Sequence, residues 1–156
     1  PGKQDIRFFL TKRTNVVQHH KGQISLPGGA WEEGEQLWET ALRETNEEIG
    51  VRAERIQFMG ALTPLFVPVT GFLIHPFVGW VDDKPETYPD PTEVESLFAV
   101  SVSALMDQNS CHREEQTIRD YVFDVPYFLL NKQKVWGATS MVLSEFKTVL
   151  KKVIDE

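Results

Sequence analysis

The spacing of hydrophobic residues predicts two amphipathic helices, one in the first third of the chain and one at its end. Over Leu37–Ile49 the apolar positions recur every three or four residues, and Gly50 follows as a typical helix stop. The same rhythm runs through residues 138–154. Each helix is therefore expected to pack one face against a hydrophobic core.

Shorter apolar runs, bounded by Gly, Pro, Asp or Asn, predict β-strands. These runs cover residues 5–13, 23–26, 55–66, 71–82, 93–100, 118–125 and 127–130. Loops are expected at 82–91, which is rich in Pro and Asp, and at 109–116, which is polar. Ser101 or Ser103 is expected to cap a short helix that ends near Asp107. Strands mixed with helices in this order predict an α+β fold.

Length and composition are those of a globular protein with one domain over residues 1–156. The chain is 41% hydrophobic and 25% charged, and it is long enough to bury a core. Its single cysteine, Cys111, excludes an internal disulfide framework and favours a reducing compartment, so we expect a cytoplasmic protein. A net charge of -7 argues against nucleic acid as a partner.

The apolar run at residues 61–81 invites a membrane interpretation. It contains three prolines and two glycines, which interrupt a helix too often for it to span a bilayer. Two strands joined by a Pro/Gly turn explain the run better, and we expect no membrane association.

Acidic residues concentrate in one short stretch of the chain. Residues 29–51 hold seven Glu and one Arg, a local charge of -6 out of the total of -7. On the predicted helix, Glu44, Glu47 and Glu48 are spaced i, i+3 and i+4 and share one face. Like charges at these spacings cost about 0.2–0.5 kcal/mol per pair, so a compensating partner is expected.

A hard divalent cation is the partner that best explains this face. Mg²⁺ prefers oxygen ligands and commonly binds a few carboxylates together with substrate phosphates. It neutralises phosphate oxygens and activates water, while a remaining carboxylate acts as general base. The pattern therefore predicts hydrolysis of a phosphate anhydride. The alternative is an ordinary solvated acidic helix face, against which the spacing argues.

The letters of this stretch support the metal interpretation. Their pattern resembles the Nudix box, the signature of the Nudix hydrolases: Gly29-x5-Glu35-x7-Arg43-Glu44-Thr45-x-Glu47-Glu48-x-Gly50-Val51. At Thr45 the family usually has an aliphatic residue. The resemblance implies a Nudix-type α/β/α sandwich with a mixed central sheet. It also implies a strand before Pro1, so we expect the natural first strand to be absent from this chain.

The same resemblance implies roles for individual residues. Glu44, Glu47 and Glu48 would bind Mg²⁺ or Mn²⁺, and Glu47 or Glu48 would serve as general base. Arg43 would orient the carboxylates, and the carbonyl group of Gly29 would complete the metal shell. How many metals bind, and which Glu is the base, stays open.

The segment before the box is basic, because residues 6–31 contain no Asp or Glu. Its cations and histidines are Arg7, Lys12, Arg13, His19, His20 and Lys21. Such cations are suited to meet phosphates while the carboxylates hold a metal, although ordinary surface positions on a hairpin would also account for them.

Several segments resemble the coenzyme A diphosphatases, a Nudix subfamily. They are residues 10–14, 20–23, 26–29, 68–72 and 135–139. The resemblance implies that Arg13, His20 and Lys21 bind substrate, and that coenzyme A is cleaved to 4'-phosphopantetheine and adenosine 3',5'-bisphosphate. The chain departs from the subfamily at Gln18, where an Arg is usual, and thus lacks a rigid bidentate phosphate donor there.

Other interpretations stay open at this point. The substrate could instead be ADP-ribose, a nucleotide sugar or a dinucleoside polyphosphate, or the chain could be a non-catalytic nucleotide-binding module. A complete set of box carboxylates argues against the module. Glu93, Glu114 and Glu115 are candidates for a further ligand or base, with solvated loop positions as the alternative. The sequence does not say whether the protein forms a homodimer.

Overall fold

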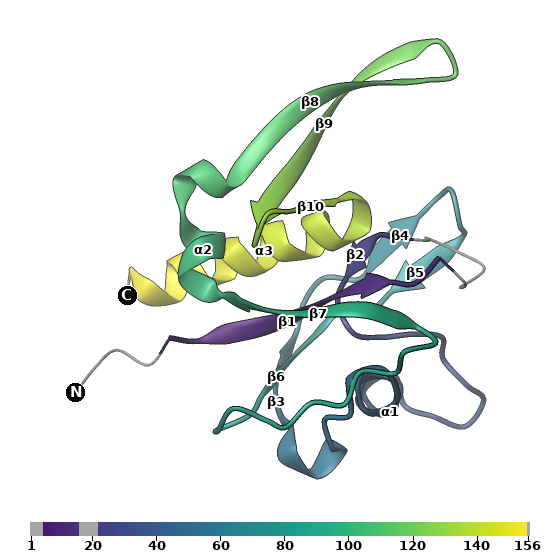
Figure 1. The fold of residues 1–156 in the computed structure, drawn as a ribbon, viewed down its shortest axis with the longest axis vertical. Helices are drawn as coiled ribbons and strands as arrows, with labels where there is room; N and C mark the ends of the chain where they lie inside the picture. Colours follow the sequence, from purple (N-terminus) through teal and green to yellow (C-terminus); the bar gives the residue numbers. More distant parts are fainter. Residues whose placement is uncertain (1–4, 16–21, 156) are drawn as a thin grey trace. The chain divides into compact units, whose positions relative to one another are not determined.

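The computed structural model describes residues 5–15 and 22–155 (Figure 1). The predicted substrate residues His20 and Lys21, as well as Gln18, lie outside the described residues. The chain groups into two compact units, Thr11–Leu97 and the remainder on both sides of it. The expectation of a single domain over 1–156 stays a prediction.

The strands β1 (Arg7–Arg13) and β7 (Val94–Ser101) each begin in one unit and end in the other. Together with β2 (Ile24–Ser25) they form a three-stranded sheet of order β2-β1-β7. The pairing of β1 with β2 is antiparallel, and it joins Thr11 to Ser25 and Lys12 to Ile24.

The unit Thr11–Leu97 contains the predicted box helix. Besides the sheet strands above, its elements are α1 (Leu37–Ile49), a 3-10 turn η1 (Ala53–Arg55), β3 (Gln57–Ala61), β4 (Leu65–Val67), β5 (Phe72–Ile74) and β6 (Phe77–Trp80). The prediction of α1 is confirmed at both ends. The aromatic rings of Trp38, Phe58 and Phe77 pack together, with centroids 5.1 to 6.2 Å apart.

The two long strands predicted in this unit are wrong in extent. Residue 55 lies in η1, and each predicted strand is divided into two short ones. Pro64 and Pro76 lie at the two interruptions, where their missing N–H groups cannot join a ladder. The resulting antiparallel pairs are β3 with β6 and β4 with β5.

The other unit contains a second sheet and the terminal helix. Its elements are α2 (Val102–Met106), a 3-10 turn η2 (Gln108–Ser110), β8 (Cys111–Ile118), β9 (Tyr121–Leu130), β10 (Gln133–Trp136) and α3 (Gly137–Ile154). The sheet order is β10-β9-β8, with both pairings antiparallel. Ser101 caps α2 by accepting a hydrogen bond from the Ala104 N–H, as predicted. Leu105, Leu130, Val135 and Leu143 are buried.

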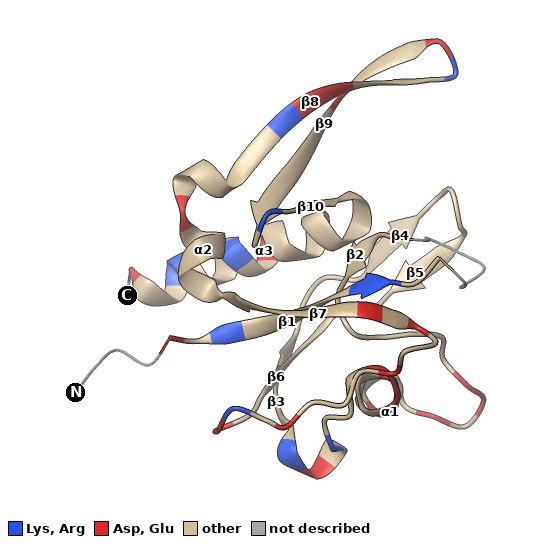
Figure 2. Cartoon of the chain, viewed as in Figure 1, with Lys and Arg blue, Asp and Glu red and all other residues tan. Residues whose placement is uncertain are grey.

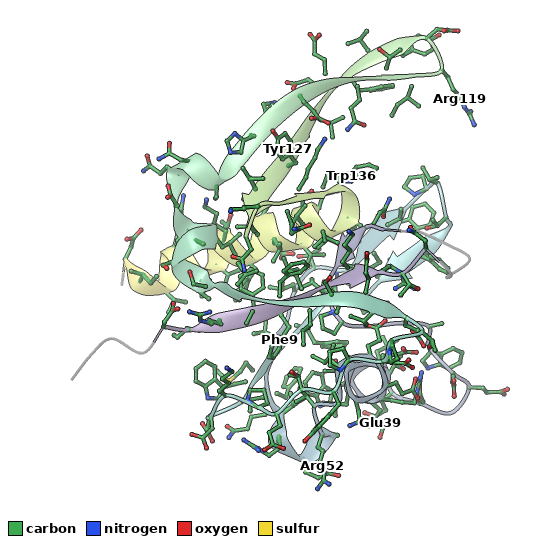
Figure 3. The ribbon with its side chains drawn as sticks, viewed as in Figure 1. Phe9, Glu39, Arg52, Arg119, Tyr127 and Trp136 are labelled. Atoms are coloured by element: carbon green, nitrogen blue, oxygen red, sulfur yellow. The ribbon has the colours of Figure 1, made fainter. Side chains whose placement is uncertain are left out.

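The predicted polar loop at 109–116 is wrong, because most of it belongs to β8. This strand pairs along its whole length with β9, and the two form a long hairpin with Arg119 at its tip (Figures 1 and 3). Arg119 and Asp120 have φ of 49° and 67°, which forms the tight turn of a two-residue hairpin. The predicted strand at 118–125 therefore starts at Tyr121 instead.

Helices and strands are intermixed along the chain, so the α+β class is confirmed. None of the helices in the described residues is long and apolar enough to cross a membrane.

Candidate functional site

Helix α1 is anchored at both of its ends. At the start, the Glu39 side chain accepts a hydrogen bond from the Gln36 N–H at 2.8 Å. At the other end, the backbone N–H groups of Tyr88 and Asp90 donate to the carbonyls of Ile49 and Glu48, at 2.8 and 2.9 Å. The loop after β6 therefore satisfies carbonyl groups that a helix end leaves unpaired, and it fixes the turn that carries Glu47 and Glu48.

Gly50 permits this close approach of the loop. Its φ is 75°, in the left-handed region that glycine enters without strain. A Cβ atom at Gly50 would also lie 2.9 Å from the Cβ atom and the backbone nitrogen of Tyr88. Both the helix stop and the contact with the loop require the absence of a side chain here.

Arg43 connects several of the box carboxylates. Its guanidinium donates to Glu35 at 2.5 Å, to Glu44 at 2.9 Å and to Glu47 at 3.2 Å, and also to the Ala30 carbonyl at 2.9 Å. Figure 2 shows the acidic positions gathered on α1 and on the segment before it. The hydrogen bonds from Arg43 and Thr40 lower the pKa of Glu35 from 4.5 to about 2.

Glu48 is the most enclosed of the three predicted ligands, with only 3% of its side chain exposed. Its Oε2 accepts a hydrogen bond from the Gly28 N–H at 3.3 Å, and its Oε1 lies 3.7 Å from Nη1 of Arg13. Burial raises the pKa of Glu48 to about 7, and the negative charges of Glu93 and Glu44 add to the rise.

Glu44 lies between Arg43 and the backbone of Gly29. A Cβ atom at Gly29 would overlap the Glu44 carboxylate, so only glycine leaves room for that group. Burial raises the pKa of Glu44, Arg43 opposes the rise, and Glu47 and Glu93 add to it. The negative charge of Glu93 thus affects both Glu44 and Glu48. Glu93 directly precedes β7 and is distant from both residues in the sequence.

The donor set fits a hard divalent cation. Carboxylate and carbonyl oxygens are the groups that Mg²⁺ prefers, and a cation would relieve the mutual repulsion of Glu44, Glu48 and Glu93. In the described residues no three His, Cys, Asp or Glu side chains are already grouped to hold an ion. Instead, Arg43 holds Glu44 and Glu47, while Gly28 and Arg13 contact Glu48.

The predicted site residues of this unit come together around α1. Gly29, Arg43, Glu44 and Glu47 form one connected set, and Arg13 contacts Glu48. Glu114 and Glu115 lie on β8 in the other unit, where the Glu114 carboxylate is paired with Lys134 and Gln116. The roles of these residues as ligands, base or substrate contacts stay predictions.

Sequence reasoning missed the backbone partners of the site. Nothing in the letters indicated that the Gly28 N–H would reach Glu48, or that Tyr88 and Asp90 would cap the helix. One local signal was available at Asp90-Pro91-Thr92, since Asp before Pro favours a turn. There, the Asp90 carboxylate accepts hydrogen bonds from the N–H and the hydroxyl of Thr92, both at 2.8 Å.

Two known proteins are similar to this chain in sequence. Nudix hydrolase 3 of Caenorhabditis elegans is 31% identical over 158 residues, which cover 91% of this chain and 66% of the worm protein. The mitochondrial coenzyme A diphosphatase NUDT8 of Homo sapiens is 29% identical over 142 residues, which cover 89% of this chain and 60% of the human protein. This chain thus spans less than two thirds of the length of either relative.

The fold is shared with solved structures as well. The crystal structure of a C. elegans Ap4A hydrolase binary complex superposes with a TM-score of 0.53 at 18% identity, over 62% of this chain and 69% of that chain.

The NUDIX domain family matches residues 2–121, a range that contains the whole box. Members of this family generally use divalent metals. The chain therefore belongs to the NUDIX domain family, the family of the Nudix hydrolases.

Proposed function

We propose that this protein is a hydrolase of nucleoside diphosphate linkages that depends on Mg²⁺ or Mn²⁺. The observation that carries the proposal is the set of carboxylates on and beside α1. Glu44 pairs with Arg43 and Glu48 with Arg13, and the negative charge of Glu93 helps to raise the pKa of both carboxyl groups. A cluster of oxygen donors of this kind suits a cation that also binds substrate phosphates.

The chain's own residues would divide the chemistry among them. When bound, the metal neutralises phosphate oxygens and makes its water a better nucleophile. Glu47 or Glu48 accepts the proton of the attacking water. Glu44 completes the carboxylate set, Arg43 orients it, and Arg13, His20 and Lys21 contact the substrate phosphates.

The preferred substrate is coenzyme A or a derivative, split into 4'-phosphopantetheine and adenosine 3',5'-bisphosphate. Support comes from the segments on both sides of the box that resemble the subfamily, and from the name of the human relative, a coenzyme A diphosphatase. Water would attack one phosphorus of the diphosphate, and the P–O–P bridge would break with the bridging oxygen leaving on the other phosphate.

A product-resolved substrate screen tests this assignment. Coenzyme A, ADP-ribose, a nucleotide sugar and a dinucleoside polyphosphate are incubated in parallel with Mg²⁺ or Mn²⁺, and the products are separated by chromatography. The highest kcat/KM is expected for coenzyme A. Faster cleavage of one of the other three compounds would make that compound the preferred substrate of the same reaction, in place of coenzyme A. Tight binding without any product would identify a non-catalytic binding module and refute the enzyme.

A cytoplasmic location is part of the proposal, supported by the single exposed thiol of Cys111. The human relative is named as mitochondrial, so the location needs its own test. Cell fractionation with antibodies against this chain is expected to recover it with the cytoplasmic markers, and co-purification with mitochondria would refute this.

A further inference from the structure

We propose that Arg13 is a positioning residue that holds the Glu48 carboxylate in the orientation that metal binding requires. This inference rests on the proposed function, and it adds a role for Arg13 that differs from a direct contact with substrate phosphate. It follows from how the end of β1 is fixed, from the partners of Glu48, and from one nitrogen of Arg13 that has no partner among the described residues.

Backbone hydrogen bonds fix the position from which the Arg13 side chain extends. The Arg13 N–H donates to the Gln23 carbonyl at 3.0 Å, and the next residue, Thr14, donates its N–H to the Glu93 carbonyl at 3.0 Å. The Thr14 hydroxyl adds a bond to the Thr92 carbonyl at 2.9 Å. The end of β1 is thus held between two backbone segments, one of which carries Glu93.

The two oxygens of Glu48 have separate partners. Oε2 accepts from the Gly28 N–H, and Oε1 lies 3.7 Å from Nη1 of Arg13. Because 97% of the Glu48 side chain is covered, bulk water is a poor substitute for either partner.

The Nε atom of Arg13 bears on why the guanidinium has its observed orientation. Nε is buried and has no hydrogen-bond partner among the described residues. Leaving a buried donor unpaired destabilises the folded state, so such groups persist where another requirement dominates. Here the guanidinium faces Glu48 although its own Nε stays unsatisfied. Among the described residues, Glu48 supplies the carboxylate that pairs with the Arg13 guanidinium.

The neighbouring Lys12 provides a matched control. It extends from the same strand and pairs with Glu95 at 3.1 Å, outside the box carboxylates. Both members of that pair are partly exposed, so the pair contributes little to stability. The K12M variant thus removes one positive charge from β1 without removing a partner of Glu48.

The decisive experiment measures Mn²⁺ affinity without substrate, by electron paramagnetic resonance titration, for the wild type and for R13M, R13K and K12M. Groups that orient a metal ligand typically change affinity by about 10–100-fold when removed. R13M is therefore expected to bind Mn²⁺ at least about tenfold more weakly. R13K should retain most of the affinity, because a 3.7 Å ion pair needs a nearby charge rather than a fork of donors. K12M should match the wild type.

A double-mutant cycle separates this role from a general loss of structure. In the E48Q background, R13M is expected to weaken Mn²⁺ binding no further, because its partner is already altered. Additive losses in the cycle, or an unchanged affinity in R13M, would overturn the proposal. If thermal unfolding shows that R13M does not fold, R13Q takes its place as a neutral variant with the same expected loss.

Kinetics with the best substrate of the screen give a second readout. A positioning role predicts that R13M lowers kcat more than it raises KM. A raised KM with unchanged Mn²⁺ affinity would leave Arg13 with a phosphate contact alone and overturn the proposal. If the wild type binds Mn²⁺ but cleaves no substrate, the proposed function fails, while the Mn²⁺ titrations still decide the role of Arg13.

Discussion

Glu47 and Glu48 are neighbours in the sequence but occupy different environments. The Glu47 side chain is 52% exposed and contacts Arg43, whereas that of Glu48 is 3% exposed and contacts Gly28 and Arg13. An exposed carboxylate is free to move toward a ligand, whereas a buried one is placed by its surroundings. Both residues are candidates for metal ligand or general base. Glu47 would have to move toward the bound metal or water, whereas Glu48 would already be held in position.

Replacing either carboxylate by its amide tests the mechanism. E47Q and E48Q are each expected to lower the metal-dependent rate at least about tenfold, because a general base contributes on the order of 10²–10⁴-fold and a lost ligand weakens the metal site. E33Q, which neutralises an exposed Glu of the same acidic stretch, serves as the control. Wild-type rates in both E47Q and E48Q would refute the assignment.

Glu35 provides a prediction about acid stability. Its pKa is lowered to about 2 from an ordinary value of 4.5 by hydrogen bonds from Arg43 and Thr40. A lowered pKa contributes stability that is complete above pH 4.5 and is lost as pH falls toward 2. The free energy of unfolding of the wild type should therefore exceed that of E35Q near neutral pH, and the difference should shrink on acidification.

Urea unfolding of both proteins at several pH values between neutral and strongly acidic measures this difference. Arg43 also pairs with Glu44 and Glu47, so part of its contribution persists in E35Q at every pH. A difference that does not change with pH would show that the Glu35 carboxylate is not held in its ionised form.

At the scale of elements, the end of α1 depends on the loop that covers it. The loop donates two backbone hydrogen bonds to the helix end, and Gly50 lets Tyr88 approach. This contact lies next to Glu47 and Glu48, so the geometry of the loop and the geometry of the site are coupled through the last turn of the helix.

The G50A variant separates backbone strain from this contact. Placing alanine in the left-handed region costs about 1–2 kcal/mol, and the new Cβ atom would also displace Tyr88. G71A is a matched control, because Gly71 has φ of 72° and no atom within 4 Å of its added Cβ. Chemical denaturation should show a larger loss of unfolding free energy in G50A than in G71A. Equal losses would mean that the loop around Tyr88 shifts to accommodate the new Cβ atom at no energetic cost.

At the scale of the molecule, the carboxylate cluster links metal binding to stability. Burial and mutual repulsion disfavour the charged forms of Glu44 and Glu48 in the metal-free protein. A cation that binds only the folded state raises its stability, by about 2.7 kcal/mol at a concentration of 100 times Kd. Mg²⁺ or Mn²⁺ should therefore raise the melting temperature.

Differential scanning calorimetry with increasing Mg²⁺, and again after chelation with EDTA, measures this effect. The shift should be much smaller in E48Q, which lacks one of the proposed charged ligands, and should stay at its wild-type size in K12M. An equal shift in the wild type and E48Q would place the stabilising ion elsewhere on the molecule.

The sequence by itself determined the elements that depend on local pattern. Helix α1 follows from the spacing of its apolar residues and from Gly50, and α3 follows from the same rhythm. The candidate chemistry followed as well, because Glu44, Glu47 and Glu48 must share a face on any α-helix. In contrast, β8 has few apolar residues, and it is a strand because β9 pairs with it along its whole length.

Only the tertiary structure decided which groups surround those carboxylates. Glu93 is 45 residues from Glu48 in the sequence, Arg13 is 35 residues away and Gly28 is 20, and chain folding brings all three to it. No local pattern encodes such proximity, because it depends on how strands and loops pack around α1. The candidate metal ligands could therefore be predicted from the sequence, whereas the burial of these carboxylates, their charge balance and their backbone partners could not.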